Sequence, residues 1–495
     1  MTTEDTPIKT ARKKSGFAYD VLKLVSGTTF AQFISILAAP LLTRLYAPEA
    51  FGIWSLFVSI TSIVGIIACM SYENAIMLPK SDEEATNLLG VSLGFTLLIS
   101  LLMVPLAWWG RTTILKWLNA LTLGSYLWLV PLVVLVNGLF VALNYWNSRT
   151  RHFGRLSIAR VTSSLTTIPM TLVLGFAGYT TAGSMIGAGI AGQTVATTVL
   201  GVQIWRDDRK IFLKSVRWQA MRECIKRYKK FPLYESWASL MNTISAQVPS
   251  LLLATFFTSS VVGFYSLGYR LLSMPMALIG ASIQQVFFQR AAAAKHDERL
   301  SFIVHNTFTR LSILGLFPFL LVMILGKEIF PLIFGSRWAE AGIYAQILAP
   351  WVFFNFVSSP ISALFDVLEM QGRYFIFNSI LLSTRIASLM IGGFLNSVLV
   401  SLMLFSITGS IIYFCLCLFF LDKAGLTMKV LFRDIYQMIL IAFILILPVI
   451  ALKNYGIQTW AVVIVGCLCG LIYYAILFYR DKELKKLMTF IIHLS

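Results

Sequence analysis

Apolar runs of about 20 residues recur along the chain from Val21 to Tyr479, separated by short segments that carry charges, prolines or glycines. A helix of that length rises about 30 Å, which is the thickness of the hydrocarbon core of a bilayer. The pattern therefore predicts an all-α integral membrane protein with about fourteen transmembrane helices. We expect these helices at residues 21–42, 52–78, 88–109, 125–147, 156–177, 181–204, 233–256, 262–288, 302–325, 344–370, 374–396, 398–421, 434–452 and 457–479.

Lysines and arginines divide unequally between the loops on the two sides of these helices. With the N-terminus inside, the outer loops keep only Arg44, Arg111, Lys116, Lys327, Arg337 and Lys453. The other basic loops and both termini fall on the inner side, including the basic segment 206–230 and the group Arg149, Arg151, Arg155 and Arg160. The positive-inside rule then predicts an even number of helices and two cytoplasmic termini. The formal net charge of +18 follows from this topology, so it indicates attraction to anionic membrane lipids and not binding to nucleic acid.

The composition excludes a soluble protein, because 58% of the residues are hydrophobic and 13% are charged. Soluble domains have about 45 to 50% apolar and about 25% charged residues. The four histidines form no metal-binding motif, and neither a Gly-rich phosphate loop nor a nucleophile elbow is present. We therefore expect no bound metal, no cofactor and no enzymatic activity.

The chain also contains a weak internal repeat. Three segments of the first half match three segments of the second half in the same order and at nearly one spacing: 31–32 with 246–247, 52–56 with 263–267, and 80–83 with 295–298. Each half carries a proline in its first helix, Pro40 and Pro249, where it should kink the helix. Because six helices separate the copies, both halves run in the same direction and are related by an axis along the membrane normal.

The repeat predicts two pseudo-symmetric six-helix lobes followed by two additional C-terminal helices. We expect the chain to divide into an N-terminal tail 1–20, an N-lobe 21–204, a cytoplasmic basic linker 205–232, a C-lobe 233–421, two additional helices 434–479 and a C-terminal tail 480–495.

Four segments carry a resemblance to a known family. They are PLLTRLYAPEAFG at 40–52, YENAIMLP at 72–79, GYRLLSMP with QQVFFQRA within 268–291, and WAEAGIY at 338–344. Together they resemble the polysaccharide transporter family, the Wzx-like O-antigen and oligosaccharide flippases of the multidrug/oligosaccharidyl-lipid/polysaccharide exporter superfamily. The resemblance covers about residues 20 to 425.

The resemblance implies two lobes around a central cavity that opens alternately to either side of the membrane. The implied substrate is an oligosaccharide linked to polyprenyl pyrophosphate, such as undecaprenyl pyrophosphate. It is moved to the outer leaflet of the bacterial inner membrane for O-antigen, capsule or exopolysaccharide synthesis. A polysaccharide polymerase and a chain-length regulator are candidate partners.

Other functions stay open at this point. The two additional C-terminal helices exceed the twelve common in the family and are shared with the lipid II flippase. A multidrug exporter of the same superfamily is a further alternative, although a cationic drug should favour buried acids. A membrane polysaccharide polymerase would usually carry one large outer loop, and the longest outer loop here, around 327–342, is short.

Arginines inside the predicted helices are the main candidates for binding a pyrophosphate, because a guanidinium stays charged and can hold phosphate oxygens in a bidentate fork. Arg385 lies about 18 Å from the inner face, near the midplane. A charge there costs at least about 2.5 to 3.5 kcal/mol, so we expect it to face a cavity or an ion-pair partner. Arg270 lies about 12 Å from the outer end of its helix and is the second candidate.

Three further residues complete the predicted site. Gln32 and Gln247 are expected to bind substrate, because the repeat places both on the first helix of a lobe. Amides inside helix bundles also simply join helices, which is the alternative for both. Glu73 is the deepest acid and is expected to bind a coupling proton or to pair with an arginine.

Overall fold

The computed structural model describes residues 17–295, 297, 299–426 and 428–480 and shows an all-helical membrane protein. Most of the two predicted tails, 1–20 and 480–495, lies outside the described residues. The helices are α1 Phe17–Leu45, α2 Pro48–Gly65, α3 Tyr72–Ala75, α4 Asp82–Trp109, α5 Arg111–Trp117, α6 Val130–Arg149, α7 Phe153–Phe176, α8 Ala182–Ser215, α9 Trp218–Arg227, α10 Ser236–Phe256, α11 Ser259–Leu272, α12 Ala281–Ala293, α13 Arg299–Phe334, α14 Ala339–Ile361, α15 Leu364–Val367, α16 Gln371–Phe394, α17 Val398–Lys423, α18 Met428–Asn454 and α19 Thr459–Arg480.

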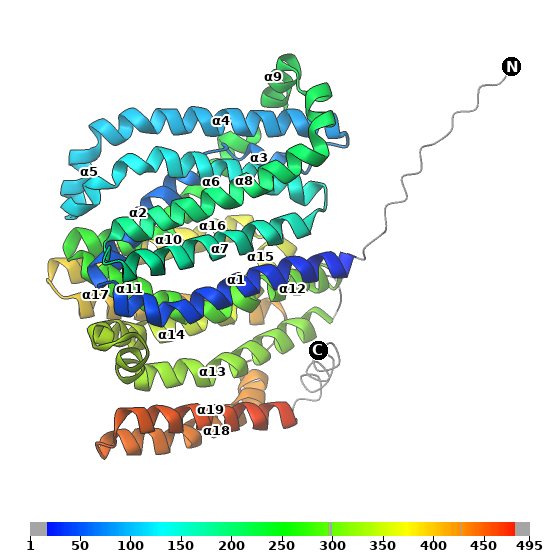
Figure 1. Cartoon of the computed structure of the whole chain (residues 1–495). Helices are drawn as coiled ribbons and strands as arrows, with labels where there is room; N and C mark the ends of the chain where they lie inside the picture. The colour runs from blue at the N-terminus through cyan, green and yellow to red at the C-terminus, as the bar shows by residue number, and fades with distance from the viewer. Residues whose placement is uncertain (1–16, 296, 298, 427, 481–495) are drawn as a thin grey trace.

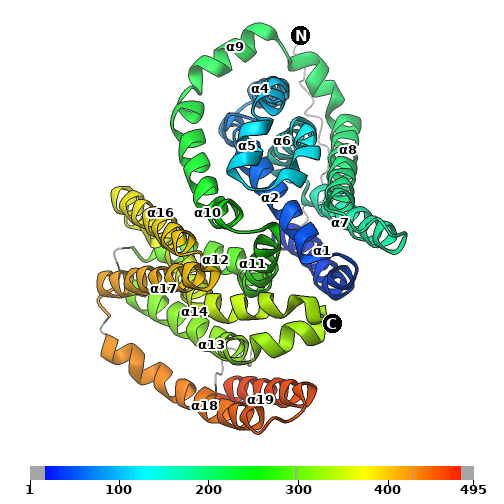
Figure 2. The ribbon, with the colours of Figure 1, turned by 90° about the vertical axis from the view of Figure 1, so that its left-hand side faces the viewer.

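Eleven helical segments of the described chain are long and apolar enough to cross a membrane, and Thr29–Leu45 of α1 is a shorter apolar segment. The long helices lie side by side with their axes roughly parallel (Figure 1). Viewed from one end, α1, α2 and α4 to α8 form one group, and α10 to α14, α16 and α17 form a second group (Figure 2). The short α3 packs on α4 and α6 of the first group, and α15 packs on α12 and α16 of the second. We call these groups the first half and the second half. The last two helices, α18 and α19, pack on the outside of α13.

Several helix boundaries differ from the expected ones. The helix expected at 302–325 continues to Phe334, and the one expected at 344–370 ends at Ile361 and is followed by the short α15. The second helix, predicted to reach residue 78, ends at Gly65, because the chain turns through Met70 and Ser71 with positive φ of 50° and 55°. The predicted helix 262–288 is divided into α11 and α12, and Pro275, which has no N–H to donate, lies between them. The sixth predicted helix continues from residue 204 to Ser215.

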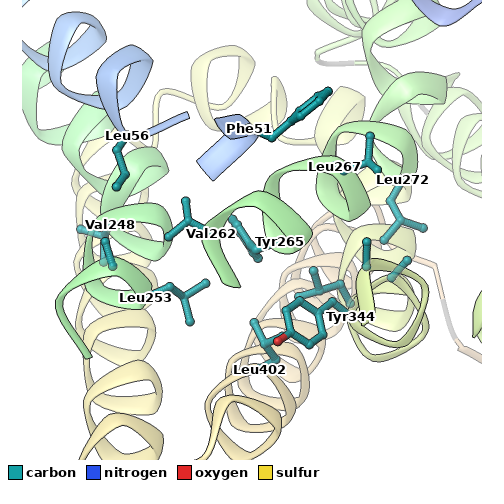
Figure 3. Close-up of a cluster of buried hydrophobic side chains, with 14 of the residues drawn as sticks. Phe51, Leu56, Val248, Leu253, Val262, Tyr265, Leu267, Leu272, Tyr344 and Leu402 are labelled. Carbon is teal, nitrogen blue, oxygen red and sulfur yellow. The ribbon is translucent and has the colours of Figure 1, made fainter. Parts of the chain in front are cut away.

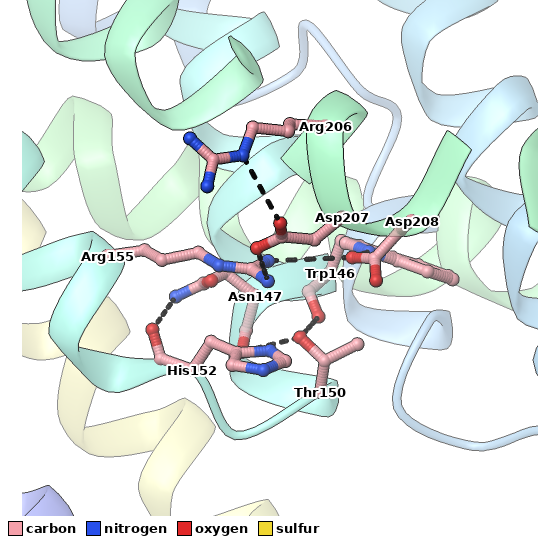
Figure 4. Close-up of polar contacts among 8 residues, drawn as sticks. All are labelled: Trp146, Asn147, Thr150, His152, Arg155, Arg206, Asp207 and Asp208. Carbon is pink, nitrogen blue, oxygen red and sulfur yellow. Dashed lines mark hydrogen bonds and ion pairs between the residues drawn. The ribbon is translucent and has the colours of Figure 1, made fainter. Parts of the chain in front are cut away.

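A polar network holds this extension of α8 (Figure 4). Arg155 of α7 contacts Asp207 at 2.6 Å and Asp208 at 3.5 Å. The indole Nε1 of Trp146 donates to the carboxylate of Asp208 at 3.0 Å. The basic segment that follows the sixth predicted helix is therefore largely helical, and it continues as α9, which packs on α4.

The two halves meet along α2 and α11, where two glycines allow close approach. A Cβ atom at Gly52 would lie 1.7 Å from the carbonyl oxygen of Ser259, and one at Gly263 would lie 2.0 Å from the carbonyl oxygen of Pro48. The repeat pairs Gly52 with Gly263, so each glycine faces the first turn of the other's helix. A side chain at either position would push the backbones apart.

Buried apolar side chains surround this crossing (Figure 3). They include Phe51 and Leu56 of α2 and Val262 and Tyr265 of α11, and all four are buried. Trp338 is fully buried against Phe51, with ring centroids 4.9 Å apart, and its Nε1 donates to the carbonyl of Thr43 at 2.8 Å. The end of the bundle at which α2 and α11 begin is therefore tightly closed.

Candidate functional site

A cavity of about 460 Å³ lies inside the first half, between α1, α2, α7 and α8, and is reached by one residue of α11. Its polar lining consists of Gln32, Ser35, Trp54, Arg160, Ser163, Ser164, Thr167, Thr171, Gln193 and Arg270. No carboxylate lines it among the residues that the structure describes. A cavity with two arginines, amides and hydroxyls, and without an acid, suits an anionic ligand that also offers hydroxyl groups.

The α7 wall is built by a periodic polar stripe. Arg160, Ser163, Thr167 and Thr171 follow one another at three or four residues, which places them on one face of the helix. Thr171 Oγ1 donates to the carbonyl of Thr167 at 2.7 Å, within the helix. A hydroxyl that donates in this way still has lone pairs to accept a hydrogen bond from a ligand.

Sequence reasoning missed Arg160. The distribution of basic residues groups it with the inner loops as a signal of topology, although the predicted helix 156–177 contains it. The structure places it in the third turn of α7, half-buried, on the cavity face. The missed signal was the spacing of polar residues that continues from it along the helix.

Arg270 reaches the cavity from the second half. It lies in the last turn of α11 with an exposed side chain, and its Cζ is 6.0 Å from the ring centroid of Trp54. The close crossing of α2 and α11 brings this arginine to the first half. Gln32 of α1 lines the same cavity, so the structure unites two of the predicted site residues, Gln32 and Arg270.

Gln247 does not line this cavity, because it faces the contact between α10 and α2. The hydroxyl of Ser59 on α2 donates to its Oε1 at 2.8 Å. This amide therefore joins the two halves of the protein in this structure.

Arg385 also lies apart from the cavity, on the face of α16 that packs on α10. Its Nη1 donates to the carbonyl oxygen of Ser245 at 3.1 Å and to the Ser245 hydroxyl at 3.0 Å. Its Cζ lies 5.8 Å from the ring centroid of Trp351. Both contacts are with neutral groups.

Glu73 is buried in α3, near the start of the second half. Its side chain is 7% exposed, and Oε2 has no hydrogen-bond partner among the described residues. The adjacent Asn74 donates to Oε1 of Glu235 at 2.6 Å. Burial without a partner disfavours the charged form of a carboxyl group.

Sequence comparison identifies relatives in polysaccharide synthesis. A family model described as "polysaccharide biosynthesis protein" matches residues 41–343. An uncharacterized membrane protein in the cps region of Klebsiella pneumoniae is 23% identical over 371 residues, which cover 71% of this chain and 73% of that protein. The lipopolysaccharide biosynthesis protein WzxC of Escherichia coli (strain K12) is 26% identical over 228 residues, covering 45% of this chain and 41% of WzxC.

Structural comparison identifies the fold. The lipid II flippase MurJ in an inward closed conformation matches with a TM-score of 0.73 at 14% identity, covering 92% of this chain and 99% of MurJ. An inward-facing MATE family multidrug resistance transporter of the MOP superfamily matches with a TM-score of 0.65 at 12% identity, covering 82% and 98%. The chain therefore has the fold of MOP superfamily transporters.

Proposed function

The chain belongs to the polysaccharide biosynthesis protein family, and from this premise we propose that it is a flippase for a polyprenyl-pyrophosphate-linked oligosaccharide. It moves this substrate from the cytoplasmic to the outer leaflet of the bacterial inner membrane for surface polysaccharide synthesis. The names of the relatives support this, since one is a lipopolysaccharide biosynthesis protein and another is a membrane protein of a cps region.

The observation that carries the proposal is the pair of arginines, Arg160 and Arg270, that line one cavity from opposite halves. A pyrophosphate carries negative charge and accepts bidentate hydrogen bonds from guanidinium groups. The hydroxyls of α7 and the amides Gln32 and Gln193 offer hydrogen-bond partners to sugars. A cationic drug would be repelled by the same lining, which disfavours the multidrug exporter.

The proposal includes fourteen membrane spans. Helices α1, α10 and the broken pair α11 and α12 cross the membrane together with the eleven apolar spans. Both termini are then cytoplasmic, as the distribution of basic residues requires. The closed end with Trp338 and Thr43 then faces outward. Separation of the halves at the opposite end would open the cavity toward the cytoplasm.

Glu73 is the proposed site of a coupling proton. Its burial, with one oxygen unpaired, supports proton uptake, and its neighbour Asn74 contacts Glu235 at the start of the second half. A polysaccharide polymerase and a chain-length regulator remain proposed partners, since they would act on the translocated product.

Arg160→Ala and Arg270→Ala test the proposal. Each removes charge-assisted hydrogen bonds worth about 1.5 to 3 kcal/mol, so transport at limiting substrate should fall by roughly ten- to a hundredfold. The assay is translocation of a polyprenyl-pyrophosphate-linked oligosaccharide in proteoliposomes. Arg206→Ala is the matched control, because this arginine is exposed on the extension of α8, away from the cavity.

Transport by both cavity variants at the rate of the Arg206→Ala control would overturn the assignment of the cavity. The alternative function has its own test: growth of a bacterial strain depleted of its lipid II flippase, when it expresses this chain, would favour lipid II as the substrate.

A further inference from the structure

Pro249 lies inside α10 and leaves one backbone acceptor of this helix without its usual donor. Proline has no N–H, so the carbonyl of the residue four positions earlier loses its helical hydrogen bond. In α10 that residue is Ser245. A backbone carbonyl at membrane depth requires another donor, because lipid offers none.

Arg385 supplies this donor from the neighbouring helix α16. Its Nη1 hydrogen bonds to the Ser245 carbonyl at 3.1 Å, and the same nitrogen donates to the Ser245 hydroxyl at 3.0 Å. The acceptor of the half-buried guanidinium is thus the carbonyl whose helical donor Pro249 removes.

An aromatic column fixes the other side of the guanidinium. Arg385 Cζ lies 5.8 Å from the ring centroid of Trp351, which stacks on Tyr269 at 5.5 Å. Tyr269 in turn stacks on Tyr265 at 5.9 Å, within α11. The ring faces attract the cation without neutralising it, so this side of Arg385 is occupied by the protein itself.

We propose that Arg385 is a positioning residue that clasps α10 at Pro249, and that it does not bind the substrate phosphate. The clasp lies next to the contact between the halves, because Gln247, two residues after Ser245, accepts a hydrogen bond from Ser59 of α2. By holding α10 to α16, Arg385 keeps α10 in a fixed position relative to the rest of the second half while the two halves move. The inference rests on the proposed transport function only for its activity measurement.

The test is a double-mutant cycle between Arg385→Ala and Pro249→Ala. In the wild-type background, loss of Arg385 leaves the Ser245 carbonyl without a donor, so we expect about a tenfold loss of transport and a lower Tm of the purified protein. Pro249→Ala restores the helical N–H. In that background the same arginine substitution should change transport by less than about twofold and leave Tm nearly unchanged.

Two further variants sharpen the result. Pro40→Ala, in the corresponding first helix of the first half, is the matched control and should not rescue Arg385→Ala. Arg385→Lys should retain most of the transport, because an ammonium group can also donate to a carbonyl, whereas a bidentate phosphate ligand would be lost.

An equal loss of transport on Arg385→Ala in both backgrounds, with Tm rescued by Pro249→Ala, would mean that Arg385 contacts substrate and would overturn the proposal. Equal effects on Tm in both backgrounds would overturn it as well, and this comparison holds even if Pro249→Ala itself transports poorly. Because Tm needs no substrate, failure of the clasp is distinguishable from failure of the proposed function.

Discussion

Gly52→Ala should strongly destabilise the contact between the two halves. The added Cβ would lie 1.7 Å from the Ser259 carbonyl oxygen, whereas a carbon and a carbonyl oxygen normally approach to about 3.3 Å. The clash is with backbone, which cannot rotate away, so α2 and α11 must separate by roughly 1.5 Å. Overpacked sites typically lose about 1 to 3 kcal/mol of stability. We expect a loss at the upper end of this range, because the separation also loosens the buried side chains around the crossing.

The measurement is the Tm of the purified protein in detergent, and the matched control is Gly65→Ala at the end of the same helix. Nothing lies within 4 Å of a Cβ at Gly65, so this substitution should leave Tm unchanged or raise it slightly. Combining Gly52→Ala with Gly263→Ala should lower Tm by less than the sum of the two, because one separation relieves both clashes. Equal Tm values for Gly52→Ala and Gly65→Ala would refute the reasoning.

Three other outcomes are expected. Trp338→Phe keeps the buried ring but removes the donor to the Thr43 carbonyl, so it should lower stability by about 1 to 3 kcal/mol, measured as a fall in Tm, with Trp460→Phe as the exposed control. Burial, and less strongly the neighbouring Glu84, raise the pKa of Cys224 on α9 to about 11. Its alkylation, followed by mass spectrometry, should therefore be slow near about pH 7.5 and accelerate as the pH rises toward the pKa. Arg155→Gln removes the two ion pairs that hold the α8 extension to α7, so limited proteolysis should cut the segment after α8 faster than in the wild type.

The all-helical membrane fold and the family could be predicted from the sequence because both depend on local signals. Long apolar runs mark spans wherever they pack, and short motifs identify relatives. The ends of helices were harder to predict. The turn after Gly65 uses Met70 and Ser71 in left-handed conformations, which neither residue type indicates. The extension of α8 depends on Asp207 meeting Arg155, a contact across helices that no local pattern reveals.

The position of a residue along a helix could also be predicted from the sequence, whereas its direction around the helix axis could not. Arg385 lies near the middle of α16, and packing decides that it faces Ser245 and not the cavity. Arg270 and Gln32 face the cavity, and counting residues along the helix could not distinguish them from Arg385. Arg160 was assigned by its charge alone, although its polar neighbours at helical spacing indicated its face.

The linker divides the sequence before α10, but the hydrogen bonds of α10 do not follow this division. Helix α10 begins the second half in sequence, yet it is fastened to the first half near its start, by Asn74 to Glu235, and at its middle, by Ser59 to Gln247. If the halves separate from one end, these two hydrogen bonds must break one after the other. In the proposed transport cycle, α10 is therefore the helix through which a movement of one half would be transmitted to the other.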